Sequence, residues 1–215
     1  MMRVTGWRVA AAAAALMIVP TAVVHAQRIG VVAGATFSQL RGIENVKAKN
    51  RQGTMFGATL RLPLGAAMAI QPELLFVNKG SELELGTGET KNLRLDYFEL
   101  PVLLRFEGGQ GSAFGPHFYA GPSIGYNLDC KVSSSGVTNT SSDCKRDDFL
   151  KPAKLEWSGI VGAGVDLSVG GLGVTGGARY GVGLSNISKD DSDDFESRVR
   201  NGTLTVYVGV LFGKR

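Results

Sequence analysis

A stretch of strict alternation between apolar and polar residues near the middle of the chain constrains the fold more than any other feature. Glu99 and Arg105 lie on one face of this stretch. Every second residue on the other face is apolar: Phe98, Leu100, Val102, Leu104 and Phe106. Because successive side chains of a β-strand point to opposite faces, the pattern predicts a strand with one wholly apolar face and one face that carries both signs of charge.

The same alternation recurs along the chain and predicts eight strands, at residues 28–38, 53–64, 67–79, 92–106, 113–128, 155–169, 172–184 and 202–212. The connections alternate in length. Tight turns are expected at 65–66, 107–112 and 170–171, and long polar loops at 40–52, 80–91, 129–154 and 185–201. Alternating segments of about ten residues, joined by short turns and longer loops, are the signature of a transmembrane β-barrel. We therefore predict an all-β fold, an eight-stranded antiparallel transmembrane β-barrel preceded by a cleavable signal peptide.

The N-terminal 26 residues have the features of an export signal. Arg3 and Arg8 supply a positive start, residues 9–19 form an apolar run, and Val24-His25-Ala26 fits a cleavage site before Gln27. The alternative is an N-terminal membrane anchor, but the apolar run is shorter than the roughly 20 residues that a spanning helix needs. We expect a signal peptide over residues 1–26, an outer-membrane β-barrel domain over residues 27–215, and export through the periplasm to the cell outer membrane.

The composition of the mature chain fits this expectation. Without Arg3 and Arg8, 21 of the 23 Lys and Arg residues remain, against 19 Asp and Glu residues. This near balance predicts no nucleic-acid partner. Gly accounts for 30 of 215 residues, which is about twice the usual share of ~7%. Gly within strands marks bends and close approaches of backbones, and a small barrel needs both.

The alternation also assigns the two faces of the strands. The outward sets contain no charged residue, and aromatic residues gather at their ends, as a girdle at the membrane interface requires. The predicted lipid-facing aromatic residues are Phe37, Phe56, Phe76, Phe98, Phe106, Phe118, Tyr126, Trp157 and Phe212. The inward sets hold charges of both signs, which we expect to form a paired network in the lumen, because buried charges need partners. This predicted network comprises Arg61, Glu73, Glu99, Arg105, Asp166 and Arg179.

A water-soluble β-barrel or sandwich is the competing interpretation of the same alternation. In such a protein the apolar face would form the core, and the charged face would meet water. The alternating loop lengths, the Phe residues that bracket the apolar faces and the export signal favour the membrane barrel.

Several segments resemble one family of bacterial proteins. Residues 95–106, LDYFELPVLLRF, resemble the "L-x-Y-L-E-I-P-L-L-L-K-Y" strand of PorT-like outer-membrane β-barrel proteins, often labelled porin family. Residues 119–126, YAGPSIGY, are similar to the family's next strand, and residues 70–76, IQPELLF, to its "Q-P-E-L-L-Y" strand. Residues 30–40 resemble its opening strand. The resemblance implies an integral outer-membrane barrel of a Gram-negative bacterium, and no single activity, since some members serve protein secretion.

The end of the chain carries a pattern that fits a barrel-assembly signal, Tyr207-x-Gly209-x-x-Phe212. We therefore expect the barrel-assembly machinery as a partner during biogenesis. Such signals usually end the chain on an aromatic residue, whereas Gly213-Lys214-Arg215 follows here. Insertion is then expected to be less efficient, or the recognised aromatic residue is Phe212.

The two cysteines, Cys130 and Cys144, fall in the longest predicted loop. An exported chain reaches an oxidising compartment, so we predict a disulfide between them. A metal site at the cysteines would lack further ligands, because His117 is the only histidine of the mature chain.

Three other patterns are weaker. Residues 171–176 match the G-x-G-x-x-G string, but no helix is predicted to follow, as dinucleotide binding requires. The acidic loop from Asp190 to Glu196 offers oxygen ligands for calcium, although its spacing is not that of an EF-hand and a solvated loop is preferred. His117 and Ser123 are six residues apart on one strand, about 20 Å, which is too far for a Ser–His hydrolase.

We therefore expect a non-enzymatic barrel with a structural or surface-interaction role, no catalytic residue, no metal and no cofactor. Eight strands leave an interior just wide enough for side chains to fill it. Outer-membrane lipids and lipopolysaccharide are the expected partners, the latter through basic loop residues such as Lys131. The alternatives are a small-solute channel or a component of a secretion machine, and an outer-membrane lipid-modifying enzyme.

Overall fold

The computed structural model describes residues 27–41, 47–84, 90–109, 113–135, 140–144, 153–169, 172–185 and 200–213. The predicted signal peptide and the acidic loop from Asp190 to Glu196 lie outside these residues. The described strands are β1 (Arg28–Arg41), β2 (Lys47–Pro63), β3 (Met68–Glu84), β4 (Thr90–Glu107), β5 (Phe114–Ser135), β6 (Thr140–Asp143), β7 (Leu155–Val169), β8 (Leu172–Gly183) and β9 (Arg200–Phe212). Within the same ranges, no helix is long and apolar enough to cross a membrane.

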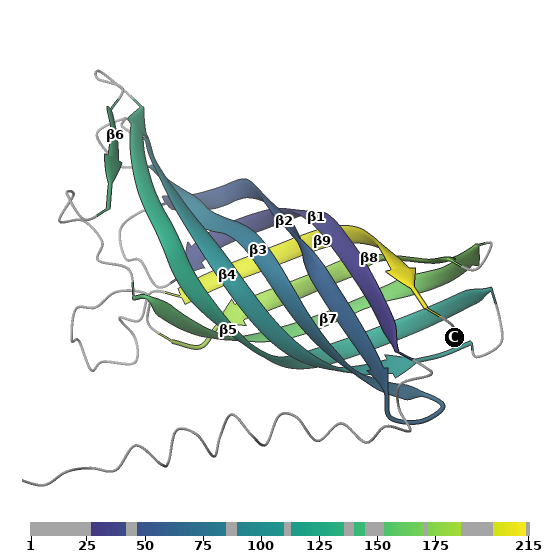
Figure 1. Cartoon of the computed structure of the whole chain (residues 1–215). Helices are drawn as coiled ribbons and strands as arrows, with labels where there is room; N and C mark the ends of the chain where they lie inside the picture. Colours follow the sequence, from purple (N-terminus) through teal and green to yellow (C-terminus); the bar gives the residue numbers. More distant parts are fainter. Residues whose placement is uncertain are drawn as a thin grey trace, which may run out of the picture.

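Eight of these strands close into an antiparallel barrel, in the order β4-β3-β2-β1-β9-β8-β7-β5 with a further pairing of β4 to β5 (Figure 1). The first and last strands close the circle, from Ile29 opposite Phe212 to Arg41 opposite Arg200. All pairings are antiparallel, as short connections between neighbouring strands allow. The predicted fold, an eight-stranded antiparallel barrel, is confirmed.

The barrel has two different ends. At one end lie the start of β1, the end of β9 and the connections at residues 64–67, 108–113 and 170–171. The other end carries the connections from β1 to β2, from β3 to β4, from β5 to β7 and from β8 to β9. We call these the turn end and the loop end.

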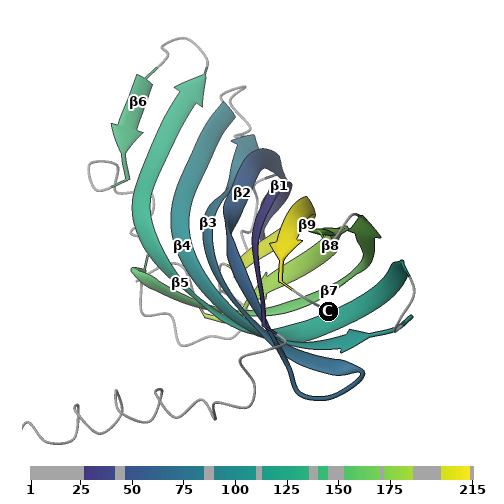
Figure 2. The ribbon, with the colours of Figure 1, turned by 45° about the vertical axis from the view of Figure 1, so that its right-hand side comes forward.

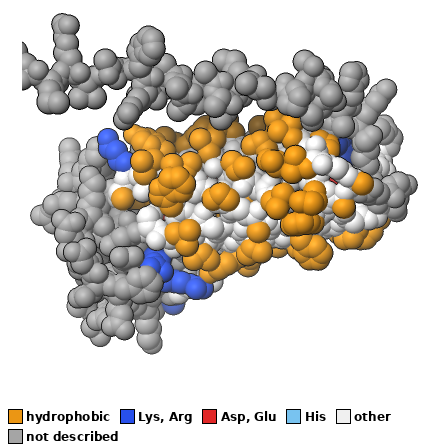
Figure 3. Space-filling model, turned by 90° about the horizontal axis from the view of Figure 1, so that it is seen from below, with side chains coloured by type: hydrophobic (Ala, Val, Ile, Leu, Met, Phe, Trp, Pro, Cys, Tyr) orange, Lys and Arg blue, Asp and Glu red, His pale blue; other side chains and the backbone are white. Residues whose placement is uncertain are grey.

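The outer wall of the barrel is apolar. Side chains that point outward are among the most exposed of the molecule, with Ile29 at 60%, Phe118 at 64% and Val208 at 66%. Figure 3 shows apolar side chains as a band along the wall, with Lys and Arg at both ends of the band and more of them toward the loop end. A soluble protein rarely exposes an apolar patch of more than a few hundred Å². The apolar face is therefore outside, which contradicts the soluble alternative.

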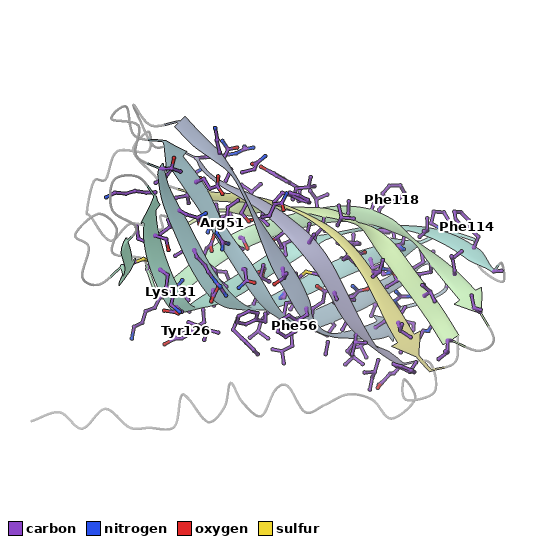
Figure 4. The ribbon with its side chains drawn as sticks, turned by 90° about the horizontal axis from the view of Figure 1, so that it is seen from above. Arg51, Phe56, Phe114, Phe118, Tyr126 and Lys131 are labelled. Carbon is purple, nitrogen blue, oxygen red and sulfur yellow. A yellow bond between two sulfur atoms is a disulfide. The ribbon has the colours of Figure 1, made fainter. Side chains whose placement is uncertain are left out.

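The predicted lipid-facing aromatic residues lie on this wall. Seven are exposed: Phe56, Phe98, Phe106, Phe118, Tyr126, Trp157 and Phe212. Phe37 and Phe76 are half-buried, and the Phe76 ring lies 5.2 Å from that of Phe56 on the neighbouring strand. Figure 4 shows Phe118 and Phe114 toward one end of the wall and Phe56 and Tyr126 toward the other.

Two of the predicted long loops are wrong. The strands continue through most of the segments predicted as loops at 40–52 and 80–91, so the connections are residues 42–46 and 85–89. Figure 2 shows β4 and β5 reaching beyond the rest of the barrel, with β6 beside β5. The ladder continues because its inner face stays apolar: Leu83, Leu93 and Leu95 are at most 2% exposed. We call this part of the sheet the loop-end extension.

The predicted loop at 129–154 is also partly strand. β5 runs to Ser135, and β6 pairs with it from Lys131 opposite Asp143 to Ser134 opposite Thr140. The disulfide between Cys130 and Cys144 is confirmed, with a Cα–Cα distance of 5.5 Å. It packs in a loop-end cluster of buried residues, Leu40, Leu93, Leu95, Tyr97, Cys130, Val132 and Cys144.

A β-bulge in β5 separates its segment in the barrel from its segment in the loop-end extension. Tyr97 is opposite Asn127, but Asp96 is opposite Asp129, so Leu128 is the additional residue. A bulge shifts the facing of all residues that follow it. Tyr126 therefore faces lipid before the bulge, whereas after it Cys130 is buried and Lys131 is exposed.

Candidate functional site

The six predicted lumen charges all lie inside the barrel, each at most 5% exposed. They come from five strands. Each occupies one of the alternate positions whose side chains face the interior of the barrel. Their pairing is arranged in three groups along the barrel axis, and several members of these groups were not predicted from the sequence.

The group nearest the turn end is centred on Asp166. Its Oδ2 accepts hydrogen bonds from Arg61 at 2.8 Å and from Arg105 at 2.6 Å. Glu107, which the sequence analysis placed in a turn, lies 3.3 Å from Arg61 and 2.8 Å from Arg105. The imidazole Nδ1 of His117 lies 3.5 Å from the second oxygen of Asp166. Each arginine therefore has two carboxylate partners.

The middle group is centred on Glu73 and Arg179, which pair at 2.5 Å. Gln71 donates to Glu73 at 2.7 Å and accepts from Arg105 at 3.3 Å, so it links this group to the first. The Arg179 guanidinium lies over the ring of Tyr207 at 4.9 Å from its centre. Such a contact adds a cation–π attraction to the ion pair.

The third group lies toward the loop end and surrounds Lys79. Its ammonium is 2.5 Å from Glu99 and 3.5 Å from Glu156. Asn201 donates to both oxygens of Glu156, at 3.0 and 3.1 Å. The sequence analysis did not assign Lys79 and Glu156 to the lumen. An even number of positions separates Lys79 from Glu73 on β3, and Glu156 from Asp166 on β7, so each pair of side chains points to the same face of its strand.

A cavity of about 20 Å³ lies between the middle group and the third group. Its lining includes Lys79, Glu99, Arg179, Ser158 and Thr203. A space of this size holds about one water molecule, and the polar groups of its otherwise largely apolar lining could offer it hydrogen bonds. Among the described residues, the lumen is packed with side chains on both sides of this small cavity.

The Ser–His pair that the sequence analysis set aside does not meet in the structure. His117 and Ser123 are both buried. The Nε2 of His117 lies 3.4 Å from the Tyr207 hydroxyl, and its Nδ1 faces Asp166. Both ring nitrogens therefore have neighbours other than Ser123. Within the described ranges, no group of three or more His, Cys, Asp or Glu side chains is arranged to hold a metal ion.

The residues of the predicted assembly signal have distinct surroundings. Tyr207 is 5% exposed and points into the lumen, where its hydroxyl receives a hydrogen bond from Tyr119 at 3.1 Å. Phe212 is 51% exposed on the outer wall. A Cβ on Gly209 would lie 2.6 Å from the carbonyl oxygen of Val31, so β9 and β1 approach closely here. Recognition by the assembly machinery stays a prediction.

Above the apolar band, the outer face of β4 and β5 becomes charged. Arg94 donates to Asp96 at 2.9 Å, and Lys131 lies 3.2 Å from Asp129. The hydrogen bond to Asp96 and the charge of this carboxylate raise the pKa of Arg94. Lys131 and Tyr126 are seen near the same edge of the barrel in Figure 4, with Lys131 further toward the loop end.

Comparisons with known proteins agree with this architecture. A family model described as outer membrane protein beta-barrel domain matches residues 22–189, whereas no curated protein matches the sequence. The outer membrane protein OprG from Pseudomonas aeruginosa is 14% identical, with a TM-score of 0.51, and the match covers 88% of this chain and 97% of that chain.

Two further solved structures are similar at lower TM-scores. Neisserial surface protein A is 12% identical, with a TM-score of 0.47 and coverage of 85% of this chain and 96% of that chain. The outer membrane enzyme PagL is 12% identical, with a TM-score of 0.38 and coverage of 86% and 99%. At such identities the likeness concerns the fold alone. Because the family model spans most of its length, the chain belongs to the outer-membrane protein β-barrel domain family, and it is an eight-stranded barrel of the outer membrane.

Proposed function

We propose that this chain is a non-enzymatic barrel with a sealed lumen, which serves a structural or surface-interaction role at the cell surface. The observation that carries the proposal is the succession of three groups of ion pairs along the lumen, from Glu107 near the turn end to Glu156 near the loop end. Large buried side chains such as Arg105, at 1% exposed, occupy the space that a water-filled channel would need.

A second closure supports the same proposal. At the loop end, the loop-end cluster places Leu93, Leu95 and Tyr97 inside the sheet, at most 2% exposed. The disulfide joins this cluster to the chain after β6. We infer that this cluster lies in the path of a solute that enters from this end, ahead of the charged lumen.

The absence of enzymatic activity is part of the proposal. The neighbours of His117 are Asp166, Tyr207 and Tyr119, and all of these side chains are buried. A lipid or peptide bond would have to enter the filled lumen to reach the imidazole. The motifs at residues 95–106 and 119–126 support a PorT-like relative, and lipopolysaccharide, outer-membrane lipids and the assembly machinery are the partners that we propose.

Planar-bilayer recording of the mature protein tests the sealed lumen. We expect no stable, large unitary currents from the wild-type protein, because the ion pairs block the path of hydrated ions. A large general porin in the same bilayer shows that open channels are detected, and the heat-dependent shift of the barrel on a denaturing gel shows that it is folded.

The double variant Cys130→Ser/Cys144→Ser separates the two closures. We expect it to be as silent as the wild-type protein, since the three lumen groups remain in place. Large currents from the wild-type protein would refute the sealed lumen and favour the channel alternative. Currents from the serine variant alone would show that the loop-end cluster, and not the ion-pair series, closes the barrel.

A further inference from the structure

The outward side chains of β3, β4 and β5 form rows across the strands near the loop end. Phe76 is opposite Phe98, and Phe98 is opposite Tyr126, so three aromatic rings form a row across the apolar wall near its loop end. Four residues further along β4, Arg94 is opposite Lys131 on β5. A row of aromatic residues is thus followed on the same face by a pair of cations.

Arg94 and Lys131 form a cross-strand pair of cations, each with a carboxylate beside it. Like charges directly opposite each other on neighbouring strands repel, and they destabilise a sheet. Both side chains remain accessible, at 45% exposed for Arg94 and 52% for Lys131. Arg94 donates through its Nε to Asp96, and the charge of Asp129 also acts on its guanidinium.

The bulge at Leu128 creates the pair. Without the additional residue, the alternation of β5 would continue unbroken. Lys131 would then point into the lumen like Tyr119 and Ser123, and no cation would lie opposite Arg94 on the outer face. With it, Cys130 turns in toward the disulfide and Lys131 turns out. Bulges commonly re-aim side chains at functional positions, and this one brings two cations together on the outer face.

The height of the pair above the apolar wall fits a lipid headgroup. Four residues of a strand span about 13 Å, which becomes roughly 10 Å along the membrane normal for strands tilted by about 40°. Aromatic girdles mark the boundary between acyl chains and headgroups. Long basic side chains that extend toward this boundary would meet phosphate groups there, and guanidinium groups bind phosphate through paired hydrogen bonds.

We propose that Arg94 and Lys131 form a clamp for a phosphate group of lipopolysaccharide, whose acyl chains lie along the wall below Phe98 and Tyr126. The clamp depends on the proposed function for the orientation of the loop end toward the cell surface. Asp96 and Asp129 hold the two cations in place when no lipid is bound. Phosphate would relieve the repulsion that the register imposes on the pair.

Native mass spectrometry of the folded mature protein with added lipid A tests the clamp. We expect one lipid A molecule with two phosphates to bind, and the form without phosphate to bind more weakly. The variant Arg94→Gln/Lys131→Gln should lose about thirtyfold in affinity for the bisphosphorylated form, given the usual contribution of each basic residue at an anionic surface. The matched control is Arg41→Gln/Lys154→Gln, which removes the same charge from other exposed positions of the rim.

The results separate a site from general attraction. A much smaller loss in the control than in Arg94→Gln/Lys131→Gln supports the clamp, because Arg41 and Lys154 lie outside the proposed phosphate contact. Equal losses in both double variants, or equal affinity for the two forms of lipid A, would overturn it. Should the first variant fail to fold, the single variants Arg94→Gln and Lys131→Gln replace it, each with a smaller expected loss. Bilayer recordings on the same variants keep the two proposals distinct, because the clamp can fail while the lumen stays sealed.

Discussion

The lumen and the loop-end extension are built from the same strands, yet they are filled by opposite kinds of side chain. On β4, Glu99 and Arg105 point inward within the barrel, whereas Leu93 and Leu95 point inward in the extension. The outer face changes in the opposite sense, from Phe98 to Arg94. Lipid surrounds the first part and water the second, so apolar side chains lie outside in the one and inside in the other.

This inversion divides the sources of stability. In the barrel, the interior depends on each charge keeping its partner, since an unpaired charge in a dry interior is strongly unfavourable. In the extension, the interior depends on apolar burial and on the disulfide. The two parts should therefore respond differently to substitutions, and the following experiments test that difference in order of expected effect.

Glu73→Ala should give the largest effect, because Arg179 would lose its carboxylate partner while 5% exposed in the lumen. We expect the free energy of unfolding to fall by about 3–5 kcal/mol. Urea-dependent unfolding of the barrel in lipid vesicles, followed by Trp fluorescence, measures this change.

Two controls distinguish the loss of pairing from the loss of packing. The double variant Glu73→Leu/Arg179→Met removes both charges and should recover most of the stability, since a buried ion pair is often replaced by apolar residues at little loss. Asp129→Ala, in an exposed ion pair, should change the free energy of unfolding by less than about 1 kcal/mol. A double variant as unstable as Glu73→Ala would show that the network itself is required.

The disulfide should matter less for the barrel than its loop length suggests. Cys130 and Cys144 are 14 residues apart, and closing such a loop is worth about 3 kcal/mol in the chain-entropy model. In Cys130→Ser/Cys144→Ser, we expect this loss to stay in the extension. Hydrogen exchange should accelerate for the amides of Lys131 and Val132, while those of Tyr119 and Gly121, within the barrel, keep their protection.

The matched control for this variant is Leu95→Ala, which removes apolar packing from the loop-end cluster while the disulfide bond stays intact. Leu95 is fully buried there, so exchange should accelerate in the same amides. Loss of protection throughout the barrel in either variant would show that the extension and the barrel unfold as one unit. Intact-mass measurement after alkylation without reductant verifies that the wild-type cysteines are oxidised.

The sequence predicted the barrel well because its strands obey one local rule, alternation along each strand. The same rule, applied to every inward-facing position up to the end of the predicted third strand and from the start of β7, would also have identified Lys79 and Glu156 as lumen residues. The lengths of β2, β3 and β5 were underestimated because polarity inverts where the strands leave the membrane, so apolar residues no longer mark the outward face there.

Other features could not be foreseen from local patterns. The pairing of Glu73 with Arg179 joins residues 106 apart in the chain, and which charge meets which depends on the stagger of all the strands between them. The bulge at Leu128 has no local signature, since it is defined by the register of β5 against β4. The facing of Lys131 therefore became visible only in the structure.

The smallest expected effects come from two glycines of β7 that face opposite sides. A Cβ on Gly162 would lie 2.4 Å from the ring of Tyr119 in the lumen, whereas a Cβ on Gly159 would meet nothing within 4 Å on the lipid-facing side. Gly162→Ala should lower the free energy of unfolding by about 1–3 kcal/mol, because the tightly packed lumen must shift. Gly159→Ala should raise it by about 0.5–1 kcal/mol, because alanine restricts the unfolded chain. Urea-dependent unfolding of both variants measures the contrast, and equal effects would mean that the lumen yields to an added methyl group as easily as lipid does.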